Sequence, residues 1–425
     1  MGENVGTTRK NIVIGVGGGI AAYKVASVIR HFTEAGHHVR VIPTEAALKF
    51  VGAATFEALS GNPVSTAVFD DVPLVPHVRL GQEADLVLIA PATADLMARA
   101  AGGRADDLLT STLLTARCPV VYVPAMHTEM WEHPATQANV AALREHGATV
   151  LTPASGRLTG ADTGAGRLPE PQEIALLGDL LLERPEALPY DLAGLKFLIS
   201  AGGTREPLDP VRYLGNRSSG KQGYALARAA AQRGAQVTLV AGATADLADP
   251  AGVEVIKIAT AAQLSDEIGK RAPETDVVIM AAAVADFRPV HLSGAKIKKS
   301  DKGPAPIELT TNPDILAGLV AARRAGEIPD TTSIVGFAAE TGDEHHGVLD
   351  HGRAKLARKG CDLLVVNAVG EGKAFGMDHN TGWILAAGGD ETALPLGSKT
   401  LMASRILDAV TVLRPDGGGT DGRCN

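Results

Sequence analysis

Residues 11–24 read NIVIGVGGGIAAYK, a short apolar run that passes through three adjacent glycines into a helix-forming segment. The other half of the chain opens in the same manner, with KFLISAGGTR at 196–205 followed by NRSSGK at 216–221. Because a strand that leads through glycines into a helix leaves bare backbone N–H groups beside a positive helix end, each segment suits a phosphate. The sequence therefore predicts two phosphate-bearing ligands, and from them two activities.

Apolar runs and helical stretches alternate along both halves of the chain. We expect a helix over 22–35 in the first half and a helix over 222–233 in the second. Gly36 and Gly234 follow these helices directly, as is typical of a helix C-terminus. Such alternation predicts an α/β fold with two doubly wound, Rossmann-like parallel sheets. The expected strands cover residues 12–16, 39–42, 86–90, 120–123, 196–201, 237–240, 277–282, 333–337 and 362–366.

The chain length and one polar segment point to two domains. A chain of 425 residues exceeds what one hydrophobic core organises, so two or three domains are expected. Pro185 and Pro189 stand in a polar stretch typical of a linker, and we place the boundary near residue 190. The predicted domains are residues 1–190 and 191–425, and the Gly- and Asp-rich end, 414–425, is expected to be disordered.

The composition excludes several classes of protein. A net charge of −8 argues against binding to nucleic acid or to an anionic membrane surface. Cys118, Cys361 and Cys424 are too widely spaced for a disulfide framework or a metal cluster, so we expect two buried thiols and one tail thiol. The polar N-terminus lacks an apolar signal core, and no apolar run approaches the roughly 20 residues that span a bilayer. We expect a cytoplasmic protein.

The first glycine-rich turn is an incomplete dinucleotide fingerprint. It reads Gly15-x-Gly17-x-x-Ile20, and isoleucine replaces the third glycine, which close packing of helix on strand requires. Thr44 stands at the end of the second strand, where a ribose diol requires a carboxylate and where a hydroxyl suits a phosphate better. These residues favour a mononucleotide such as FMN over NAD.

Further candidates surround the third and fourth strands. The small residues of APATAD, 90–95, allow a flat ring to approach the backbone. The alternative is an ordinary turn in which Thr93 or Asp95 caps the next helix. His77 and His127 are candidate acids or bases because histidine titrates near neutral pH, and the alternative for His127 is a satisfied turn histidine.

Four segments in order resemble the flavin-dependent cysteine decarboxylases, most closely the phosphopantothenoylcysteine decarboxylases. They are GGIAAYK at 18–24, His77, APATAD at 90–95 and PAM at 124–126, and the resemblance spans about residues 10–183. It implies a flavodoxin-like, flavin-binding fold in which His77 is the acid/base. The FMN site that it implies comprises Gly18, Gly19, Ile20, Thr44, Ala90, Pro91, Ala92, Thr93 and Met126.

The resemblance also implies a decarboxylation without net redox change. The substrate's cysteinyl carbon–sulfur bond is oxidised to a thioaldehyde, CO2 is lost, and the electrons return from the reduced flavin. Two positions depart from the family pattern. His127 stands where the family has an asparagine that holds the substrate carboxylate, and an imidazole can also donate to that group. Gly160 stands where the glycine-rich flap, 157–167, usually carries a cysteine, so the final proton donor stays unassigned; we expect the flap to be a mobile lid.

The second half carries a near P-loop and a basic cluster. The segment 216–221 is followed by Gln222 where a P-loop has the hydroxyl that binds Mg²⁺, and it lies far beyond its strand. An ordinary P-loop NTPase is thus disfavoured, and anion binding at a helix N-terminus is expected. The KIKK cluster at 296–299 fits a solvated face. It fits equally a triphosphate site in which Asp286 binds ribose or metal-bound water.

Two more segments allow both an ordinary and a functional interpretation. Asn312-Pro313-Asp314 is, taken alone, a turn that starts a helix. Lys355 and Lys359 lie four apart on one helix face and are, taken alone, expected to face solvent.

Together these residues resemble the CTP-dependent bacterial phosphopantothenate–cysteine ligases over about residues 194–412. TREPLDPVRY at 204–213 and NRSSGK at 216–221 are the most specific stretches. The resemblance implies that Lys296 is catalytic, that Asn216 holds an acyl intermediate and that Arg212 places the phosphopantothenate. The CTP site that it implies comprises Ala283, Asp286, Lys296, Pro313, Asp314, Ile315, Leu316, Phe337, Lys355 and Lys359.

The implied ligation has two steps. The carboxylate of 4′-phosphopantothenate attacks the α-phosphate of CTP and expels pyrophosphate, and the cysteine amine then attacks the acyl-cytidylate and releases CMP. Mg²⁺ and lysines would screen the phosphate charge, with the metal ligands unassigned. A decarboxylase ahead of such a ligase resembles the bifunctional bacterial enzymes of coenzyme A biosynthesis. The resemblance implies a homo-oligomer with trimeric decarboxylase and dimeric ligase halves, which together would give a dodecamer.

Two other functions compete with this interpretation. A two-domain NAD(P)-dependent oxidoreductase is disfavoured by the missing third glycine at Ile20 and by Thr44 in place of an acid. A non-catalytic flavin-binding regulator is disfavoured by the presence of His77 beside a complete ligase half.

Overall fold

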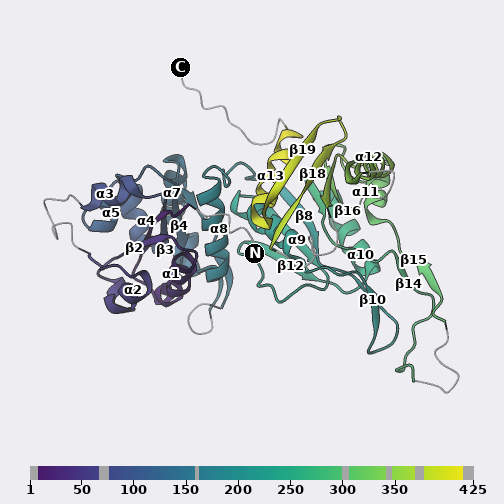
Figure 1. Ribbon diagram of the computed structural model, residues 1–425, viewed down its shortest axis with the longest axis horizontal. Helices are drawn as coiled ribbons and strands as arrows, with labels where there is room; N and C mark the ends of the chain where they lie inside the picture. Colours follow the sequence, from purple (N-terminus) through teal and green to yellow (C-terminus); the bar gives the residue numbers. More distant parts are fainter. Residues whose placement is uncertain are drawn as a thin grey trace, which may run out of the picture. The chain divides into compact units, whose positions relative to one another are not determined.

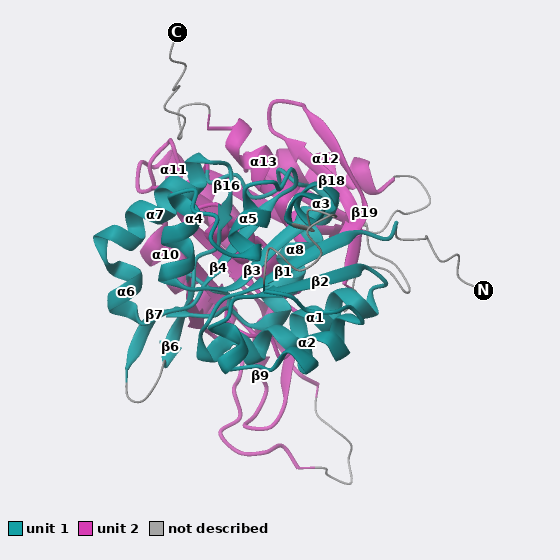
Figure 2. Cartoon of the chain, turned by 90° about the vertical axis from the view of Figure 1, so that its left-hand side faces the viewer, with its two compact units in different colours: residues 1–190, 250–252 teal, residues 191–249, 253–425 magenta. Residues whose placement is uncertain are grey.

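The computed structural model describes residues 8–66, 76–157, 162–298, 306–340, 347–368 and 378–414. Its contacts divide the chain into two compact units, coloured separately in Figure 2. Unit 1 is Met1–Tyr190 with Pro250–Gly252, and unit 2 is Asp191–Asp249 with Val253–Asn425. Each unit is described below by itself.

Unit 1 is built on a five-stranded parallel sheet with the order β2-β1-β3-β4-β5. The strand β1 pairs with β2 on one side and β3 on the other, so that Ile12 lies opposite both Val39 of β2 and Leu86 of β3. β3 is buried along its whole length, as expected for a strand covered on both faces. The strands are β1 (Asn11–Val16), β2 (His38–Pro43), β3 (Leu86–Ala92), β4 (Val120–Pro124) and β5 (Thr149–Val150), with a separate hairpin of β6 (Ala154–Arg157) and β7 (Thr163–Arg167).

Helices cover both faces of this sheet (Figures 1 and 2). One face packs against α1 and α8, where a Cβ on Gly178 would lie 2.7 Å from the Phe32 ring. The other face packs against α4, α5 and α7 through a core that includes Ile89, Leu109 and Leu143. The helices are η1 (Ile20–Lys24), α1 (Val25–Glu34), η2 (Ala47–Lys49), α2 (Ala53–Ser60), α3 (Pro76–Glu83), α4 (Ala94–Ala101), α5 (Leu108–Leu113), α6 (Thr128–Glu132), α7 (Pro134–Glu145) and α8 (Pro171–Glu183).

Unit 2 contains an eight-stranded sheet with the order β12-β11-β8-β13-β16-β17-β18-β19. The first six strands of that order are parallel, and β18 and β19 add an antiparallel hairpin at one edge. The strands are β8 (Lys196–Ala201), β11 (Gln236–Ala241), β12 (Val253–Lys257), β13 (Val277–Met280), β16 (Ser333–Glu340), β17 (Leu363–Ala368), β18 (His379–Ala386) and β19 (Glu391–Ser398).

The helices of unit 2 also lie on both faces of their sheet. α9 and α13 share one hydrophobic core, and α9 approaches β8 so closely that a Cβ on Gly223 would lie 2.5 Å from the Ala201 Cβ. The helices are α9 (Lys221–Gln232), α10 (Ala261–Arg271), η4 (Ala272–Glu274), α11 (Ile315–Arg324), α12 (Val348–Lys359) and α13 (Lys399–Val412). Two small antiparallel pairs, β9 (Arg205–Pro207) with β10 (Tyr213–Gly215) and β14 (Phe287–Pro289) with β15 (Leu309–Thr311), complete the unit.

The predicted α/β fold with two parallel sheets is confirmed, and each expected strand overlaps an observed one. The helix expected over 22–35 is wrong at its start, because the chain leaves the glycines through the 3₁₀ turn η1 before α1 begins at Val25. The antiparallel strands β18 and β19 were not predicted. The expected disordered end lies, apart from Arg414, outside the described residues.

Two of the cysteines lie in the described part of the chain. Cys361 is buried as expected, whereas Cys118 is only half-buried, and Cys424 is not among the described residues. Burial raises the pKa of both described thiols to about 11, so they remain protonated near neutral pH. Within the described ranges, no helix combines the length and the apolar character needed to cross a bilayer.

Candidate functional sites

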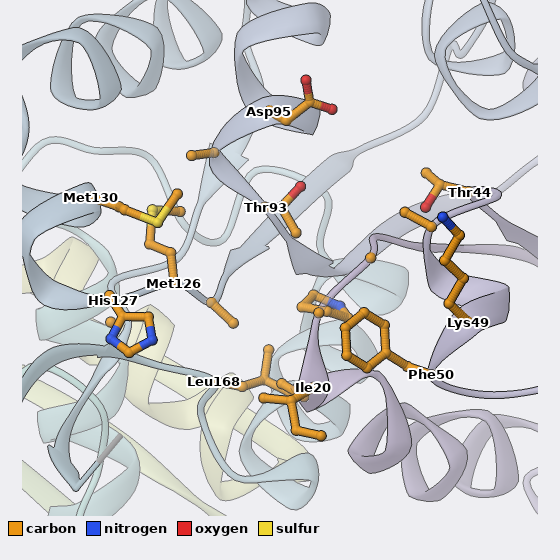
Figure 3. Close-up of a pocket in the computed structure, with 18 of the residues that line it drawn as sticks. Ile20, Thr44, Lys49, Phe50, Thr93, Asp95, Met126, His127, Met130 and Leu168 are labelled. Carbon is orange, nitrogen blue, oxygen red and sulfur yellow. The ribbon is translucent and has the colours of Figure 1, made fainter. Parts of the chain in front are cut away.

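A pocket of ≈1690 Å³ lies at the carboxyl ends of the strands of unit 1 (Figure 3). The turn after β1, the segment after β2, the end of β3 and the segment after β4 form its wall, as is typical of ligand sites in open α/β sheets. Ala90 and Ala92 are fully buried in β3 and stand outside this lining. The other residues predicted for FMN line the pocket, namely Gly18, Gly19, Ile20, Thr44, Pro91, Thr93 and Met126.

The glycine turn after β1 fits its neighbours so closely that side chains are excluded. The Gly17 N–H donates to the Pro91 carbonyl at 3.0 Å, and a Cβ on Gly17 would lie 2.4 Å from that oxygen. A Cβ on Gly18 would lie 2.4 Å from the Ala46 Cβ. Gly19 differs, because an added Cβ would meet nothing closer than 3.9 Å. The backbone at Gly19 therefore borders open pocket space, where a ligand can approach it closely.

Two threonines predicted for the FMN site also start the helical turns that follow them. Thr93 Oγ1 accepts a hydrogen bond from the Leu96 N–H at 3.3 Å, so the ordinary interpretation of Thr93 as the cap of α4 is confirmed. Thr44 Oγ1 accepts from the Ala47 N–H at 3.2 Å at the start of η2. Lys49, at the end of η2, lies beside Thr44 in Figure 3 and takes part in no ion pair among the described residues.

One wall of the pocket is a charge cluster that the sequence analysis missed. The Arg99 guanidinium binds three carboxylates, with distances of 3.1 Å to Asp95, 2.8 Å to Asp106 and 2.8 Å to Asp107. Although burial opposes its charge, the hydrogen bonds to Asp107 and Asp106 hold the pKa of Arg99 above its usual value. Asp107 also caps α5 together with Thr110. Arg99 therefore ties α4 to the start of α5.

Cations also line the rim of the pocket near the hairpin of β6 and β7. Lys24 Nζ lies 3.4 Å from Glu170 Oε1, and Arg167 forms an ion pair with the same carboxylate. The hairpin is fixed to the segment after β4, since the Met126 N–H donates to the Gly166 carbonyl at 2.9 Å. Gly166 has a positive φ of 135°, and a Cβ there would lie 2.3 Å from the Met126 carbonyl oxygen. The flap position Gly160 lies outside the described residues.

His77, the predicted acid/base, lies on α3 and does not line the pocket of its own chain. Its Nδ1 is buried and has no hydrogen-bond partner among the described residues. Thr115 donates its hydroxyl to the His77 carbonyl at 2.8 Å. A Cβ on Gly81 would lie 2.2 Å from that same hydroxyl, so glycine lets α3 approach α5. The backbone that carries His77 is therefore firmly held.

His127 does line the pocket, beside Met126 and Met130 (Figure 3). It occupies the N-cap position of α6, yet its side chain makes no capping hydrogen bond. The described residues therefore give no support to the alternative, in which His127 is a turn residue whose side chain hydrogen-bonds within the turn.

In unit 2, polar side chains hold the loop that follows β13. Thr204 Oγ1 accepts from the Ala285 N–H at 2.9 Å, and Asn216 Nδ2 donates to the Val284 carbonyl at 2.9 Å. Asn312 Nδ2 donates to the Ala285 carbonyl at 2.8 Å. These bonds bring three predicted site residues, Asn216, Ala283 and Asp286, into one region at the carboxyl ends of β8 and β13.

A second group of predicted nucleotide residues meets at the start of α11. Asp314 caps this helix by accepting from the Ala317 N–H at 3.1 Å, as its ordinary interpretation requires, and it also forms an ion pair with Lys359. Although burial acts in the opposite direction, the Lys359 hydrogen bond lowers the pKa of Asp314. Lys355 Nζ lies 2.9 Å from Glu340 Oε1. The expectation that both lysines simply face solvent is wrong.

The remaining predicted residues of this group lie around the same helix start. Ile315 is buried at the first position of α11, and Pro313 is exposed just before it. Leu316 packs over β16, where a Cβ on Gly336 would lie 2.7 Å from the Leu316 Cδ2. Phe337, next along β16, is half-buried.

Arg212 and Lys296 lie on two segments that extend from the same side of unit 2, the hairpin of β9 and β10 and the loop after β14 (Figures 1 and 2). The Arg212 guanidinium is bonded to Asp209, at 2.7 Å from Nη2 to Oδ2, and also to the Ile297 carbonyl at 2.6 Å. Lys296 is exposed and forms no ion pair within the described ranges. The sequence analysis missed Asp209.

The described residues contain no group of three or more His, Cys, Asp and Glu side chains arranged to hold a metal ion. Asp286 is exposed, and its backbone carbonyl accepts from the Asn312 N–H at 2.8 Å. Its carboxylate is therefore an oxygen ligand available at the edge of the nucleotide region, of the kind that Mg²⁺ prefers.

Comparisons with known proteins match both halves of the chain. Residues 3–177 match the Flavoprotein family model, and residues 192–413 match the model described as the DNA/pantothenate metabolism flavoprotein C-terminal domain. The coenzyme A biosynthesis bifunctional protein CoaBC of Mycobacterium tuberculosis is 70% identical over 401 residues, which cover 94% of this chain and 96% of the relative. The protein of the same name from Mycolicibacterium smegmatis is 68% identical over 404 residues, covering 95% and 98%.

Solved structures resemble each half separately. The C-terminal domain of a CoaBC protein matches with a TM-score of 0.43 and 34% identity, covering 53% of this chain and 98% of that chain. A phosphopantothenoylcysteine decarboxylase mutant complexed with pantothenoylaminoethenethiol matches with a TM-score of 0.39 and 29% identity, covering 41% and 100%. From the family models and the full-length relatives, this chain belongs to the CoaBC family of bifunctional coenzyme A biosynthesis proteins, with phosphopantothenoylcysteine decarboxylase and phosphopantothenate–cysteine ligase activities.

Proposed function

We propose that unit 1 carries out the decarboxylation with FMN in the pocket of Figure 3, and that unit 2 carries out the ligation with CTP and Mg²⁺. The observation that carries this proposal is that most residues predicted for FMN line one pocket at the carboxyl ends of the unit 1 strands, and that Asn216, Ala283 and Asp286 meet at the carboxyl ends of β8 and β13 in unit 2. The chain therefore makes 4′-phospho-N-pantothenoylcysteine in unit 2 and converts it to 4′-phosphopantetheine and CO2 in unit 1.

The walls of the unit 1 pocket fit the parts of FMN. The bare backbone at Gly19 and the hydroxyl of Thr44 suit the phosphate, and Lys49, which no described carboxylate pairs with, supplies a cation beside them. Pro91 and Met126 offer small or flexible apolar surface to the isoalloxazine ring. A solved protein that is 29% identical over 41% of this chain, the FMN binding protein AtHal3, supports this ligand.

FMN in this site supplies a two-electron acceptor that is restored at the end of the turnover. His127 donates a hydrogen bond to the substrate carboxylate and so orients it. Its position on the pocket wall, without a capping bond of its own, supports this role. Arg157 and Leu168, from the hairpin of β6 and β7 and just after it, border the pocket and limit the access of water.

His77 acts, in this proposal, on the pocket of the partner subunit. It stands outside the pocket of its own chain, and its buried Nδ1 has no hydrogen-bond partner among the described residues. Exposed apolar side chains around the pocket support a subunit contact there, since burying them on assembly is favourable. They are Ile20, Tyr23, Phe50 and Met130, which are 68%, 61%, 51% and 47% exposed.

In unit 2, we assign CTP to the region between the β13 loop and the start of α11. Lys359 and Lys355 place positive charge beside Asp314 and Glu340, and Phe337 and Leu316 add apolar surface for the nucleoside. Ala283 lets the nucleotide approach the backbone, and Lys296 adds a cation that screens the triphosphate during attack. Asp286 would hold Mg²⁺, directly or through water, and the metal would screen the charge of the CTP phosphates.

Asn216 and Arg212 handle the pantothenate side of the ligation. Asn216 stands beside the β13 loop through its bond to the Val284 carbonyl, which suits a residue that holds the acyl-cytidylate for attack by cysteine. A dimer of unit 2 is supported by large apolar residues exposed on the two projecting segments. These are Val211, Tyr213, Phe287, Val290, Leu292, Ile297, Ile307 and Leu309.

Inactivating each half in turn tests the proposal. His77→Asn should retain bound flavin and the ligase rate but lose CO2 release, and Asn216→Asp should retain decarboxylation while acyl-cytidylate accumulates. Co-production of His77→Asn with a flavin-deficient Thr44→Asp variant should restore part of the decarboxylase activity, because a mixed oligomer contains one complete site. CO2 release by His77→Asn alone at the wild-type rate, or full product formation by Asn216→Asp, would remove the corresponding assignment.

A further inference from the structure

Asp209 is a buried carboxylate at the tip of an otherwise exposed hairpin. It is 2% exposed, whereas Val211 two residues later is 61% exposed. Asp209 Oδ1 accepts from the N–H groups of Val211 and Arg212, each at 2.8 Å. Oδ2 accepts from Arg212 Nε at 3.0 Å, from Arg212 Nη2 at 2.7 Å and from the Ile297 N–H at 3.1 Å.

These five bonds compensate for the burial of the charge. Burial by itself raises the pKa of Asp209. The N–H groups and the Arg212 guanidinium outweigh this effect and together lower the pKa below its usual range. The hairpin does not require such a group for closure, because the Leu208 N–H already donates to the Arg212 carbonyl at 2.9 Å. The two bonds to Oδ1 also stay within the turn, whereas the three bonds to Oδ2 reach outward, to the Arg212 side chain and to the distant Ile297.

The first consequence concerns the orientation of Arg212. A guanidinium carries five N–H donors in a fixed plane. Asp209 and the Ile297 carbonyl engage Nε and Nη2, the latter at 2.6 Å from the Ile297 oxygen. Nη1 makes no hydrogen bond to any of the described residues, so its two donors remain available while the plane of the group is fixed.

The second consequence concerns the segment that carries Lys296. The next residue, Ile297, is bonded at both its N–H, to Asp209, and its carbonyl, to Arg212. The Ser293 N–H adds a bond to the Leu208 carbonyl at 3.2 Å. The backbone beside Lys296 is thus attached to the hairpin, while the lysine side chain stays exposed.

We propose that Asp209 is a positioning residue of the ligase site, which presents Arg212 Nη1 to an anionic group of 4′-phosphopantothenate and holds the backbone of Lys296 within reach of the CTP phosphates. The proposal rests on the functions proposed above for Arg212 and Lys296. Asp209 itself touches neither substrate.

The test is a double-mutant cycle with Asp209→Asn and Arg212→Lys, read out as KM and kcat of the ligation. Lysine cannot make the two-point contact with a carboxylate that arginine makes. Arg212→Lys therefore removes the same Asp209–Arg212 contact that Asp209→Asn weakens. We expect each single variant to raise KM for 4′-phosphopantothenate about 10- to 100-fold, the range of one charge-assisted hydrogen bond. The double variant should be no worse than Arg212→Lys alone, since coupled residues are not additive.

A matched control is Asp249→Asn, which removes a carboxylate from an exposed ion pair with Lys257 in the same unit. Asp249→Asn should leave the KM for 4′-phosphopantothenate and the KM for CTP unchanged. In a Trp131→Phe background, Trp383 fluorescence of Asp209→Asn should show the wild-type unfolding transition, which shows that unit 2 has folded. If Asp209→Asn does not fold, Ile297→Pro removes the N–H that Asp209 accepts, together with the exposed Ile297 side chain, and it should raise KM for CTP. Ile297→Ala removes the same side chain but keeps the N–H, and it should leave KM for CTP unchanged.

The outcomes distinguish a failure of the function proposed for Arg212 from a failure of the inference about Asp209. An unchanged KM in Arg212→Lys would overturn the function proposed for Arg212, and with it this inference. A raised KM in Arg212→Lys with unchanged KM values in Asp209→Asn would overturn the inference alone. Additive effects in the double variant, or an unchanged KM for CTP in Ile297→Pro, would also overturn it, because Asp209 would then not act through these groups.

Discussion

Replacing Gly17 by alanine should damage unit 1 and its flavin site together. The added Cβ would lie 2.4 Å from the Pro91 carbonyl oxygen, where ordinary contacts begin near 3.4 Å. The turn must therefore move by about 1 Å, and overpacking of this kind costs about 1–3 kcal/mol. The same movement breaks the 3.0 Å bond from the Gly17 N–H to Pro91, which contributes about 0.5–1.5 kcal/mol.

These two contributions predict a loss of about 1.5–4.5 kcal/mol in the free energy of unfolding of unit 1. For a unit of this size the loss corresponds to a fall of about 3–18 °C in melting temperature. Because Gly18 and Pro91 both line the pocket, the displacement should also weaken FMN binding at least about tenfold.

Trp131 fluorescence in a Trp383→Phe background reports the unfolding of unit 1, because these are the only two tryptophans of the chain. Quenching of flavin fluorescence by the apoprotein gives Kd. The control is Gly102→Ala at the end of α4, where the added Cβ would be 3.5 Å from the Ala98 carbonyl, an ordinary contact. If Gly17→Ala matched Gly102→Ala in both melting temperature and Kd, the close approach would not hold the turn and the reasoning would fail.

Two further predictions concern histidines of unit 1. His127→Asn should retain decarboxylation, since asparagine also donates to a carboxylate; an inactive variant that still binds flavin would show that the imidazole has another role. The hydrogen bond to Asp179 raises the pKa of His31 against the effect of burial. The stabilisation is therefore complete below the ordinary histidine pKa of about 6.5 and is lost as the pH rises through the raised value. Between about pH 6 and 8, wild-type unfolding free energy should fall more than that of His31→Gln, measured by urea denaturation. Equal slopes would contradict the assignment. The pKa of His37 is lowered by burial and also by the charge of His31, so its contribution has the opposite sign and changes in His31→Gln. A His37→Asn background in both proteins removes that contribution from the comparison.

The strands were predictable because each is a short apolar run bounded by glycine or polar residues. The dinucleotide fingerprint after β1 is incomplete because Ile20 occupies its third glycine position. Ile20 is 68% exposed, so close packing of helix on strand does not require glycine at this position. Thr44 and Thr93 stood out because they directly follow strands, and parallel strands deliver such residues to one edge of a sheet. Local sequence therefore contained most of the residues that line the pocket of unit 1.

Other features depend on contacts that no local pattern reveals. Asp209 meets Ile297, 88 positions further along the chain, and its carboxylate looks in sequence like any turn residue before a proline. The antiparallel strands β18 and β19 carry Gly382 and Pro395 inside them, which weakened their strand signal. His77 was found by resemblance, but its distance from its own pocket follows from the packing of α3 on α5 through Gly81.

Both units share one electrostatic arrangement, in which most cations near the sites are already paired with carboxylates. The pairs are Lys24 with Glu170, Arg99 with Asp107, Arg212 with Asp209, Lys355 with Glu340 and Lys359 with Asp314. A phosphate that binds beside such a pair either competes with its carboxylate or uses the donors that the carboxylate leaves free. The latter costs less, because no buried charge loses its partner. Paired cations thus orient a bound anion, whereas Lys49 and Lys296, which form no ion pair in the part of the chain that the structure describes, give these sites net attraction for an anionic ligand.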